Sequence, residues 1–229
     1  MEQIVQVFIS GIFSGGVYAL VSVGLALIFG IIGLVNFAHG EYLMLAMYFA
    51  YWMYNIIGLD PYQSMVINLV VMAIIGYLTY KIIMERVLEA DHSIQIILTL
   101  ALSMALQNLA LMLWKADYRN IRIDMTTDTT DIGFLTLSTP RVVAFFIAIG
   151  ASVLLYLFLQ KTYTGAAMRA VAQNGKAAQL MGINLKRTYG LAFTIGITLV
   201  GLAGLLLSPI YPAFPLVDPT SALWLLSWW

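Results

Sequence analysis

Six long apolar stretches are the feature of this sequence that most restricts its fold. They cover approximately residues 4–34, 42–57, 61–80, 94–114, 142–159 and 189–211. A helix needs roughly 20 apolar residues to cross the hydrocarbon core of a bilayer. We therefore predict an all-α protein, a polytopic transmembrane helical bundle of about six spans, with residues 1–229 forming a single domain.

Composition agrees with this prediction. The chain is 62% hydrophobic and 10% charged, whereas soluble domains are roughly 45–50% apolar and about 25% charged. The formal net charge is zero, and no basic patch is interleaved with aromatic residues, so nucleic acid is not an expected partner. Cysteine is absent, which excludes disulfides, thiolate catalysis and cysteine-ligated metals.

The polar segment 161–187 separates the last two apolar stretches. It contains no acidic residue and five basic ones: Lys161, Arg169, Lys176, Lys186 and Arg187. Its alanines favour one or two short surface helices, Asn174-Gly175 predicts a break, and Gly182 predicts a helix C-cap. The segment is interpreted either as a docking element for a soluble partner or as a basic loop that only fixes topology.

Basic residues also predict the orientation in the membrane, because short loops rich in Lys and Arg stay in the cytoplasm. With 161–187 inside, alternating crossings put Lys81 and Arg86 inside. The N-terminus and the polar loop 115–141 then lie outside. Seven basic residues are inside and four outside, and the reverse orientation would invert this bias. The loop is also predicted to contain a small hairpin ending in FLTLST.

Ionisable groups interrupt the apolar sequence at residues 36–41, NFAHGE. Such groups near a bilayer are costly and are by default functional, in a cavity or at an interface. The alternative is a structural connection at the membrane interface, with Glu41 in the first turn of the second helix, where the dipole favours a carboxylate. A lone His39 is a poor ligand set, so we predict no metal site.

Other small and polar residues predict helix contacts. Gly30 and Gly33 are expected to break the first stretch, which is longer than one crossing needs. Gly11-x-x-x-Gly15 permits close packing of a neighbouring helix. In the fourth stretch Ser103, Gln107 and Asn108 are expected to hydrogen-bond to neighbouring helices or to line a polar pathway.

Several enzymatic motifs are missing. The sequence has no G-x-x-x-x-G-K-[ST] cradle for nucleotide phosphates, and it has no H-E-x-x-H, C-x-x-C or Ser-His-Asp arrangement. We therefore expect no enzymatic activity and no cofactor. A transporter without its own energy source needs a partner that has one, and such a partner would contact segment 161–187.

Three blocks in consistent order resemble a known family. They are YALVSVGLALIFGIIGLVNFAHGEYLML (18–45), LALSMALQN (100–108) and YTGAAMRAVAQNGKAAQLMGINLKRTYGLAFTIGITLVGLAGLLL (163–207). They look like the membrane subunits of branched-chain amino-acid ABC importers. The resemblance implies a multi-pass permease of the inner membrane for leucine, isoleucine and valine. Its implied partners are a second related permease, two cytoplasmic ATPases and a periplasmic binding protein.

The resemblance also implies site residues. Segment 161–187 is similar to the cytoplasmic coupling loop of ABC importers, which would place five residues against the ATPases: Arg169, Ala170, Ala178, Gly182 and Ile183. The family signature corresponds to Asn36, Phe37, Ala38, His39, Gly40 and Glu41. Family members are expected to continue past the sixth span with a glycine-rich segment and further spans, whereas this sequence ends in SALWLLSWW, which predicts an interfacial anchor.

Other functions stay open from the sequence. Related importers carry urea or short amides, so the substrate has an alternative within the family. A stand-alone channel or secondary carrier would need a polar pathway and no cytoplasmic docking. A non-transporting scaffold or a non-functional truncated permease is a third interpretation.

Overall fold

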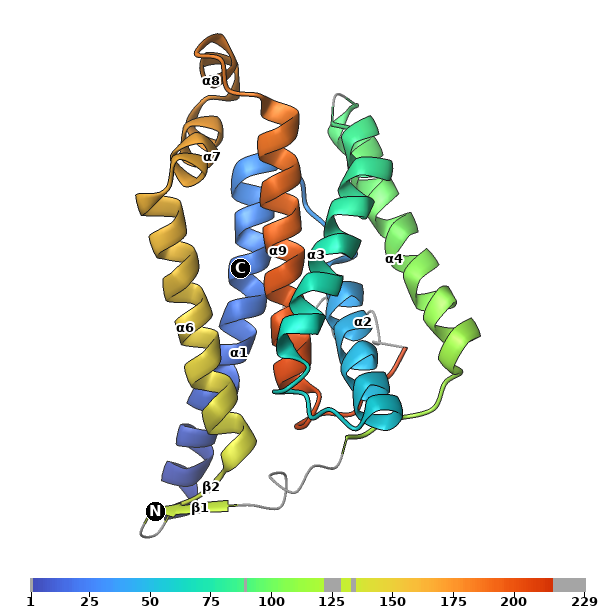
Figure 1. The fold of residues 1–229 in the computed structure, drawn as a ribbon, viewed down its shortest axis with the longest axis vertical. Coiled ribbons are helices and arrows are strands. Elements are labelled where there is room, and N and C mark those ends of the chain that lie inside the picture. Colours follow the sequence, from blue (N-terminus) through green and yellow to red (C-terminus); the bar gives the residue numbers. More distant parts are fainter. Residues whose placement is uncertain (1, 89, 122–128, 133–134, 216–229) are drawn as a thin grey trace.

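Long helices run up and down a bundle that carries two short helices at one end and a small hairpin at the other (Figure 1). The computed structural model describes residues 2–88, 90–121, 129–132 and 135–215. The prediction of an all-α bundle is confirmed, with the hairpin as a minor addition. The predicted anchor at Trp224, Trp228 and Trp229 lies outside the described residues.

The elements follow the apolar stretches closely. The helices are α1 (Glu2–Ile32), α2 (His39–Trp52), α3 (Met65–Ile82), α4 (His92–Trp114), α6 (Thr139–Lys161), α7 (Tyr163–Gln173), α8 (Gly175–Leu180) and α9 (Leu185–Leu207). A π-helical turn (Met53–Ile57) continues α2, and a 3-10 turn (Met84–Arg86) follows α3. The antiparallel strands β1 (Thr129–Ile132) and β2 (Leu135–Ser138) form the predicted hairpin.

The second predicted span differs from the others. Within the described residues, five helices are long and apolar enough to cross a membrane: α1, α3 with its 3-10 turn, α4, α6 and α9. By contrast α2 has 14 residues before its five-residue π-helical turn. A helix of that length rises ~21 Å, short of a hydrocarbon core about 30 Å thick. Figure 1 shows α2 beside only the lower part of α3.

Of the two predicted break points, Gly33 ends the first helix, whereas Gly30 lies within α1. Gly33 has φ +76°, and its N–H donates to the Phe29 carbonyl at 2.8 Å. Glycine adopts this left-handed conformation without a Cβ clash. The chain then turns back into the bundle and begins α2. The third span starts later than predicted, because Pro61 lies in the turn that precedes Met65 instead of in the first helical turn.

α9 is the central helix, and α1, α2 and α3 pack around it. Of its spanning window 78% is buried, against at most 33% in the other four candidate spans. Glycines allow the close approach. A Cβ atom built on Gly24 of α1 would lie 2.8 Å from the Gly196 carbonyl oxygen of α9, and one built on Gly196 would lie 2.8 Å from that of Gly24.

The predicted contact at Gly11 and Gly15 is not made within the described chain. A methyl group built on either residue would meet no atom within 4 Å. The close crossing of α1 lies further along, at Gly24. The two glycine sites differ in what faces them, and the spacing of small residues along one helix does not contain that information.

Candidate functional site

Three side-chain caps build the segment 161–187. At the start of α7 the Thr162 hydroxyl accepts from the Gly165 N–H at 3.0 Å. At the start of α8 Asn174 Oδ1 accepts from the Ala177 N–H, also at 3.0 Å. At the start of α9 Asn184 Oδ1 accepts from the Arg187 N–H at the same distance. Such caps satisfy backbone donors that a helix start leaves free. The predicted pair of short helices with a break at Asn174-Gly175 is confirmed.

The predicted C-cap at Gly182 is confirmed as well. Gly182 has φ +86°. Its N–H donates to the Gln179 carbonyl at 3.0 Å, and the Ile183 N–H donates to the Ala178 carbonyl at 3.1 Å. These two bonds make a Schellman motif, which closes the C-terminal end of a helix. The turn between α8 and α9 is therefore fixed by the backbone itself.

The exposed face of this segment differs from the residues that the sequence singled out. Ala178 is buried, and Ala170 and Ile183 pack against the core. Arg169 lines a groove beside α1 and α6. Of the five, only Gly182 is exposed.

Two apolar side chains that the sequence analysis missed occupy the tip instead. Leu180 is 89% exposed and Met181 is 84% exposed. The signal that could have found them is position. In a six-residue helix that buries Ala178, Leu180 is two places later and falls on the opposite face, and Met181 follows the helix as its C-cap residue.

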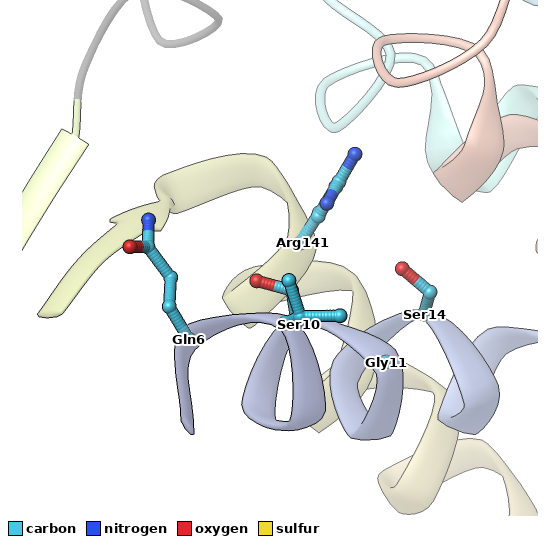
Figure 2. A pocket seen from close by; sticks show the side chains of 6 residues that line it. Gln6, Ser10, Gly11, Ser14 and Arg141 are labelled. Atoms are coloured by element: carbon cyan, nitrogen blue, oxygen red, sulfur yellow. The ribbon is translucent and has the colours of Figure 1, made fainter. Parts of the chain in front are cut away.

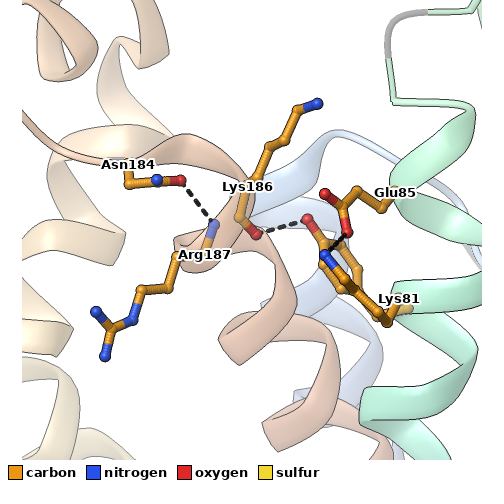
Figure 3. Close-up of polar contacts among 6 residues, drawn as sticks. Lys81, Glu85, Asn184, Lys186 and Arg187 are labelled. Carbon is orange, nitrogen blue, oxygen red and sulfur yellow. Dashed lines mark hydrogen bonds and ion pairs between the residues drawn. The ribbon is translucent and has the colours of Figure 1, made fainter.

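Polar contacts join the start of α9 to the end of α3, as Figure 3 shows. Lys81 and Glu85 form an ion pair at 2.7 Å, and the Tyr80 hydroxyl donates to the Lys186 carbonyl at 2.6 Å. Lys81, Glu85, Arg86 and Lys186 line a polar recess of about 370 Å³. Lys81 and Arg86 thus lie at the same end as α7 and α8, as the alternating crossings require.

A second polar recess lies at the opposite end, between the starts of α1 and α6 (Figure 2). Its volume is about 570 Å³, and its lining includes Gln6, Ser10, Ser14 and Arg141. Figure 2 shows the Arg141 side chain extending from α6 beside the Ser10 and Ser14 hydroxyls of α1. The two ends of the bundle therefore both carry polar surface, separated by the apolar helices.

The NFAHGE residues form a buried joint that starts α2. Asn36 Oδ1 accepts from the Ala38 N–H at 3.2 Å, and the His39 N–H donates to the Asn36 carbonyl at 3.1 Å. The His39 ring donates through Nε2 to the Val21 carbonyl of α1 at 3.1 Å. Asn36, Ala38, His39 and Glu41 are buried, while Phe37 is half-buried and Gly40 exposed. This joint connects the end of α1 to the start of α2 and is buried among the described helices.

Glu41 connects α2 to α4. Its carboxyl group is in the first turn of α2, as predicted, and the residue is 5% exposed. Glu41 Oε1 accepts from Gln107 Nε2 at 2.7 Å and from the Ser103 hydroxyl. The predicted interhelical hydrogen bonds of Ser103 and Gln107 are confirmed, whereas Asn108 donates to the Met104 carbonyl of its own helix.

Unused hydrogen-bonding capacity surrounds this joint. Within the described part of the chain, Asn36 Nδ2 and His39 Nδ1 are buried and have no hydrogen-bond partner. Buried polar atoms without partners are uncommon in folded proteins. The joint therefore offers the bundle interior donor and acceptor groups that its own structure does not use.

Comparison with known proteins decides the family. A family model described as "branched-chain amino acid transport system / permease component" matches residues 7–228. The chain belongs to this family. The permease is 27% identical over 218 residues to the high-affinity branched-chain amino acid transport system permease protein BraD of Pseudomonas aeruginosa, covering 90% of this chain and 71% of BraD. No solved structure matches the chain.

Two further relatives extend the similarity. The permease is 28% identical over 231 residues to the corresponding protein LivH of Escherichia coli, again covering 90% of this chain and 71% of the relative. It is 29% identical over 196 residues to a probable LivH of Methanocaldococcus jannaschii, covering 82% of this chain and 61% of that protein. Five helices in the described part of the chain are long and apolar enough to cross a membrane, and with its relatives this makes the permease an integral protein of the inner membrane.

Proposed function

We propose that the permease is the membrane-spanning subunit of an ABC importer that translocates leucine, isoleucine and valine across the inner membrane. In this proposal ATP hydrolysis is supplied by two cytoplasmic ATP-binding subunits, because the sequence contains no phosphate cradle of its own. A second related permease and a periplasmic binding protein complete the importer. The end that carries α7 and α8 faces the cytoplasm, and the N-terminus and residues 115–141 lie outside.

The observation that carries this proposal is the exposed apolar tip at Leu180 and Met181. Figure 1 shows α8 projecting beyond the end of α9. Both tip residues are more than four-fifths exposed and have the basic Lys176, Lys186 and Arg187 nearby in the chain. A few residues seated in pockets on a partner carry most of the binding energy of a protein contact, and an aliphatic side chain can serve as such an anchor. We assign these two side chains the role of anchors in the ATPase.

A rigid tip can transmit force. The Schellman turn and the caps at Asn174 and Asn184 fix α8 relative to α9. The buried Ala178 and the half-buried Ala170 and Ile183 seat the segment on the bundle. Pressure on α8 would therefore move α9, around which α1, α2 and α3 pack. In this role Ala170, Ala178, Gly182 and Ile183 position the docking surface, and the tip makes the contact.

We assign the NFAHGE joint a structural part in the same transmission. His39 ties the start of α2 to α1, and Glu41 ties it to α4. α4 exposes most of its surface, and only 17% of its spanning window is buried. The Glu41 bonds are therefore a main polar connection between α4 and the described bundle, and they would make α4 follow movements of α2.

A matched pair of methionines tests the docking role. Met181 is 84% exposed at the tip, and Met112 is 83% exposed on α4, so truncation removes a similar exposed side chain at each site. In the importer reconstituted with its partners, Met181→Ala lowers substrate-stimulated ATP hydrolysis and leucine uptake by about fivefold or more. This factor corresponds to the binding energy of over about 1 kcal/mol that is lost when one anchor is truncated. Met112→Ala leaves both unchanged. Equal behaviour of the two variants would remove the case for docking at the tip.

The substrate is tested separately. The binding protein encoded with this permease is titrated calorimetrically with leucine, isoleucine, valine, urea and a short amide. The proposal predicts binding of the three amino acids. Binding of urea with no response to leucine would assign the importer to the alternative substrate class.

A further inference from the structure

An apolar groove lies between α1 and α6 where α7 crosses their ends. Its volume is about 340 Å³. Its walls are Leu27 and Ile31 of α1, Leu155 and Leu159 of α6, and Met168 of α7, with Arg169 as the charged member. Both α1 and α6 are candidate membrane spans, and in such spans lipid hydrocarbon would reach the apolar walls of the groove at the end of the bundle that carries α7.

Arg169 brings an uncompensated charge into this groove. Its Nη1 atom is buried and has no hydrogen-bond partner within the described residues. A guanidinium is always charged and has five N–H donors in a planar fork that fits a phosphate or carboxylate. Segment 161–187 contains no acidic residue, and the ion pairs of the described chain involve Lys81 and Arg119 instead. The complement of Arg169 therefore comes from outside these residues.

We propose that this groove binds one anionic phospholipid, with the phosphate on the Arg169 guanidinium and an acyl chain along the aliphatic walls of α1 and α6. Charge complementarity accounts for the phosphate, and the apolar walls account for the chain. Free phosphate would use only the guanidinium and leave the walls empty. Basic pockets between spans at the cytoplasmic side are suited to anionic headgroups.

The open side of the groove supports a narrow ligand. Gly30 and Ala26 of α1 form part of its lining, and both are exposed. A Cβ atom built on Gly30 would meet no atom within 4 Å. The groove is therefore kept free by small residues, and a Cβ atom at Gly30 would displace no protein atom.

Native mass spectrometry of the full-length chain in detergent tests the proposal. Phosphatidylglycerol and phosphatidylcholine with the same acyl chains are added at equal concentration. We expect wild-type protein to retain phosphatidylglycerol preferentially. Arg169→Gln should reduce that retention by about fivefold, because this factor corresponds to the attraction of one basic side chain to an anionic lipid surface. Arg187→Gln, an exposed basic residue at the same end, is the matched control and should change little.

A second variant separates the groove from general electrostatics. Gly30→Leu keeps the charge and fills the groove, so it should also reduce phosphatidylglycerol retention. Equal losses in Arg169→Gln and Arg187→Gln, or no loss in Gly30→Leu, would overturn the proposal. Competition by inorganic phosphate would instead identify a phosphate site. Loss of the lipid when the complete importer assembles would identify a contact for a partner subunit, and either result would also refute the lipid assignment.

Discussion

At the scale of single residues, Glu41 carries the clearest prediction. Glu41→Ala leaves the Ser103 hydroxyl and the Gln107 amide without their acceptor. An unsatisfied buried group costs about 1–3 kcal/mol, so the variant should unfold at a lower temperature in detergent. Glu41→Gln keeps an oxygen acceptor and loses only the favourable charge at the helix start, about 0.3–1 kcal/mol. Its assembly with the second permease should be intact.

The two variants also distinguish structure from transport. If Glu41→Gln assembles normally but takes up no substrate, the carboxylate has a direct part in transport, and our structural assignment is wrong. If Glu41→Gln unfolds as early as Glu41→Ala, the hydrogen bonds to α4 are not what the carboxylate contributes.

Gly182 tests the docking turn through its backbone. The residue has φ +86°, and a Cβ atom there would meet no neighbour within 4 Å. Any cost of Gly182→Val is thus backbone strain, on the order of 1–2 kcal/mol. We expect normal membrane insertion and permease pairing, with lower substrate-stimulated ATP hydrolysis and uptake. Gly182→Asn, which tolerates the left-handed conformation better, should retain more of both. If Gly182→Val hydrolyses ATP and takes up substrate like the wild type, segment 161–187 is a loop that only fixes topology and has no docking role.

At the scale of elements, the crossing of α1 and α9 predicts a difference between two glycines on one helix. A methyl group at Gly24 meets the Gly196 carbonyl oxygen at 2.8 Å, whereas one at Gly15 meets nothing within 4 Å. Overpacking a well-packed contact costs about 1–3 kcal/mol. Gly24→Ala should therefore lower the thermal unfolding temperature of the purified permease, and Gly15→Ala should not. Similar unfolding temperatures would show that the α1–α9 crossing is looser than described.

Local chemistry made the helix boundaries predictable from the sequence. Gly33 and Gly182 occupy the positive-φ positions expected of helix ends, and Asn174 caps α8 at the predicted break. These features depend on residues adjacent in the chain. Three-dimensional packing decided the rest. No local signal shows that the NFAHGE joint is buried, or that Gly24 instead of Gly11 faces another backbone.

The candidate site was predictable to the same extent. Segment 161–187 was correctly placed as two short helices at the basic end, because charge and alanine content are local. Which of its residues point outward depends on how α7 and α8 sit on α9. That arrangement buries Ala178, leaves Arg169, Ala170 and Ile183 partly buried, and exposes Leu180, Met181 and Gly182.

At the scale of the whole molecule, the proposed function requires that the end of the bundle carrying α7 and α8 face the cytoplasm. α7, α8 and the end of α3 gather at one end, and the hairpin and the first turn of α6 lie at the other (Figure 1). The excess of basic residues at the α7–α8 end favours a cytoplasmic location. ATP-binding subunits can reach α8 only in this orientation.

Cysteine labelling measures this orientation directly, because the natural chain contains no cysteine. Asp117, whose side chain is 63% exposed, lies in the loop after α4, and the exposed Lys176 lies in α8. Single Asp117→Cys and Lys176→Cys variants are treated with a membrane-impermeant maleimide while the inner membrane is intact and again after it is opened. The account predicts that position 117 reacts in both cases and position 176 only after opening. Reaction of position 176 across an intact membrane would contradict the central claim that α8 meets its ATPase partner in the cytoplasm.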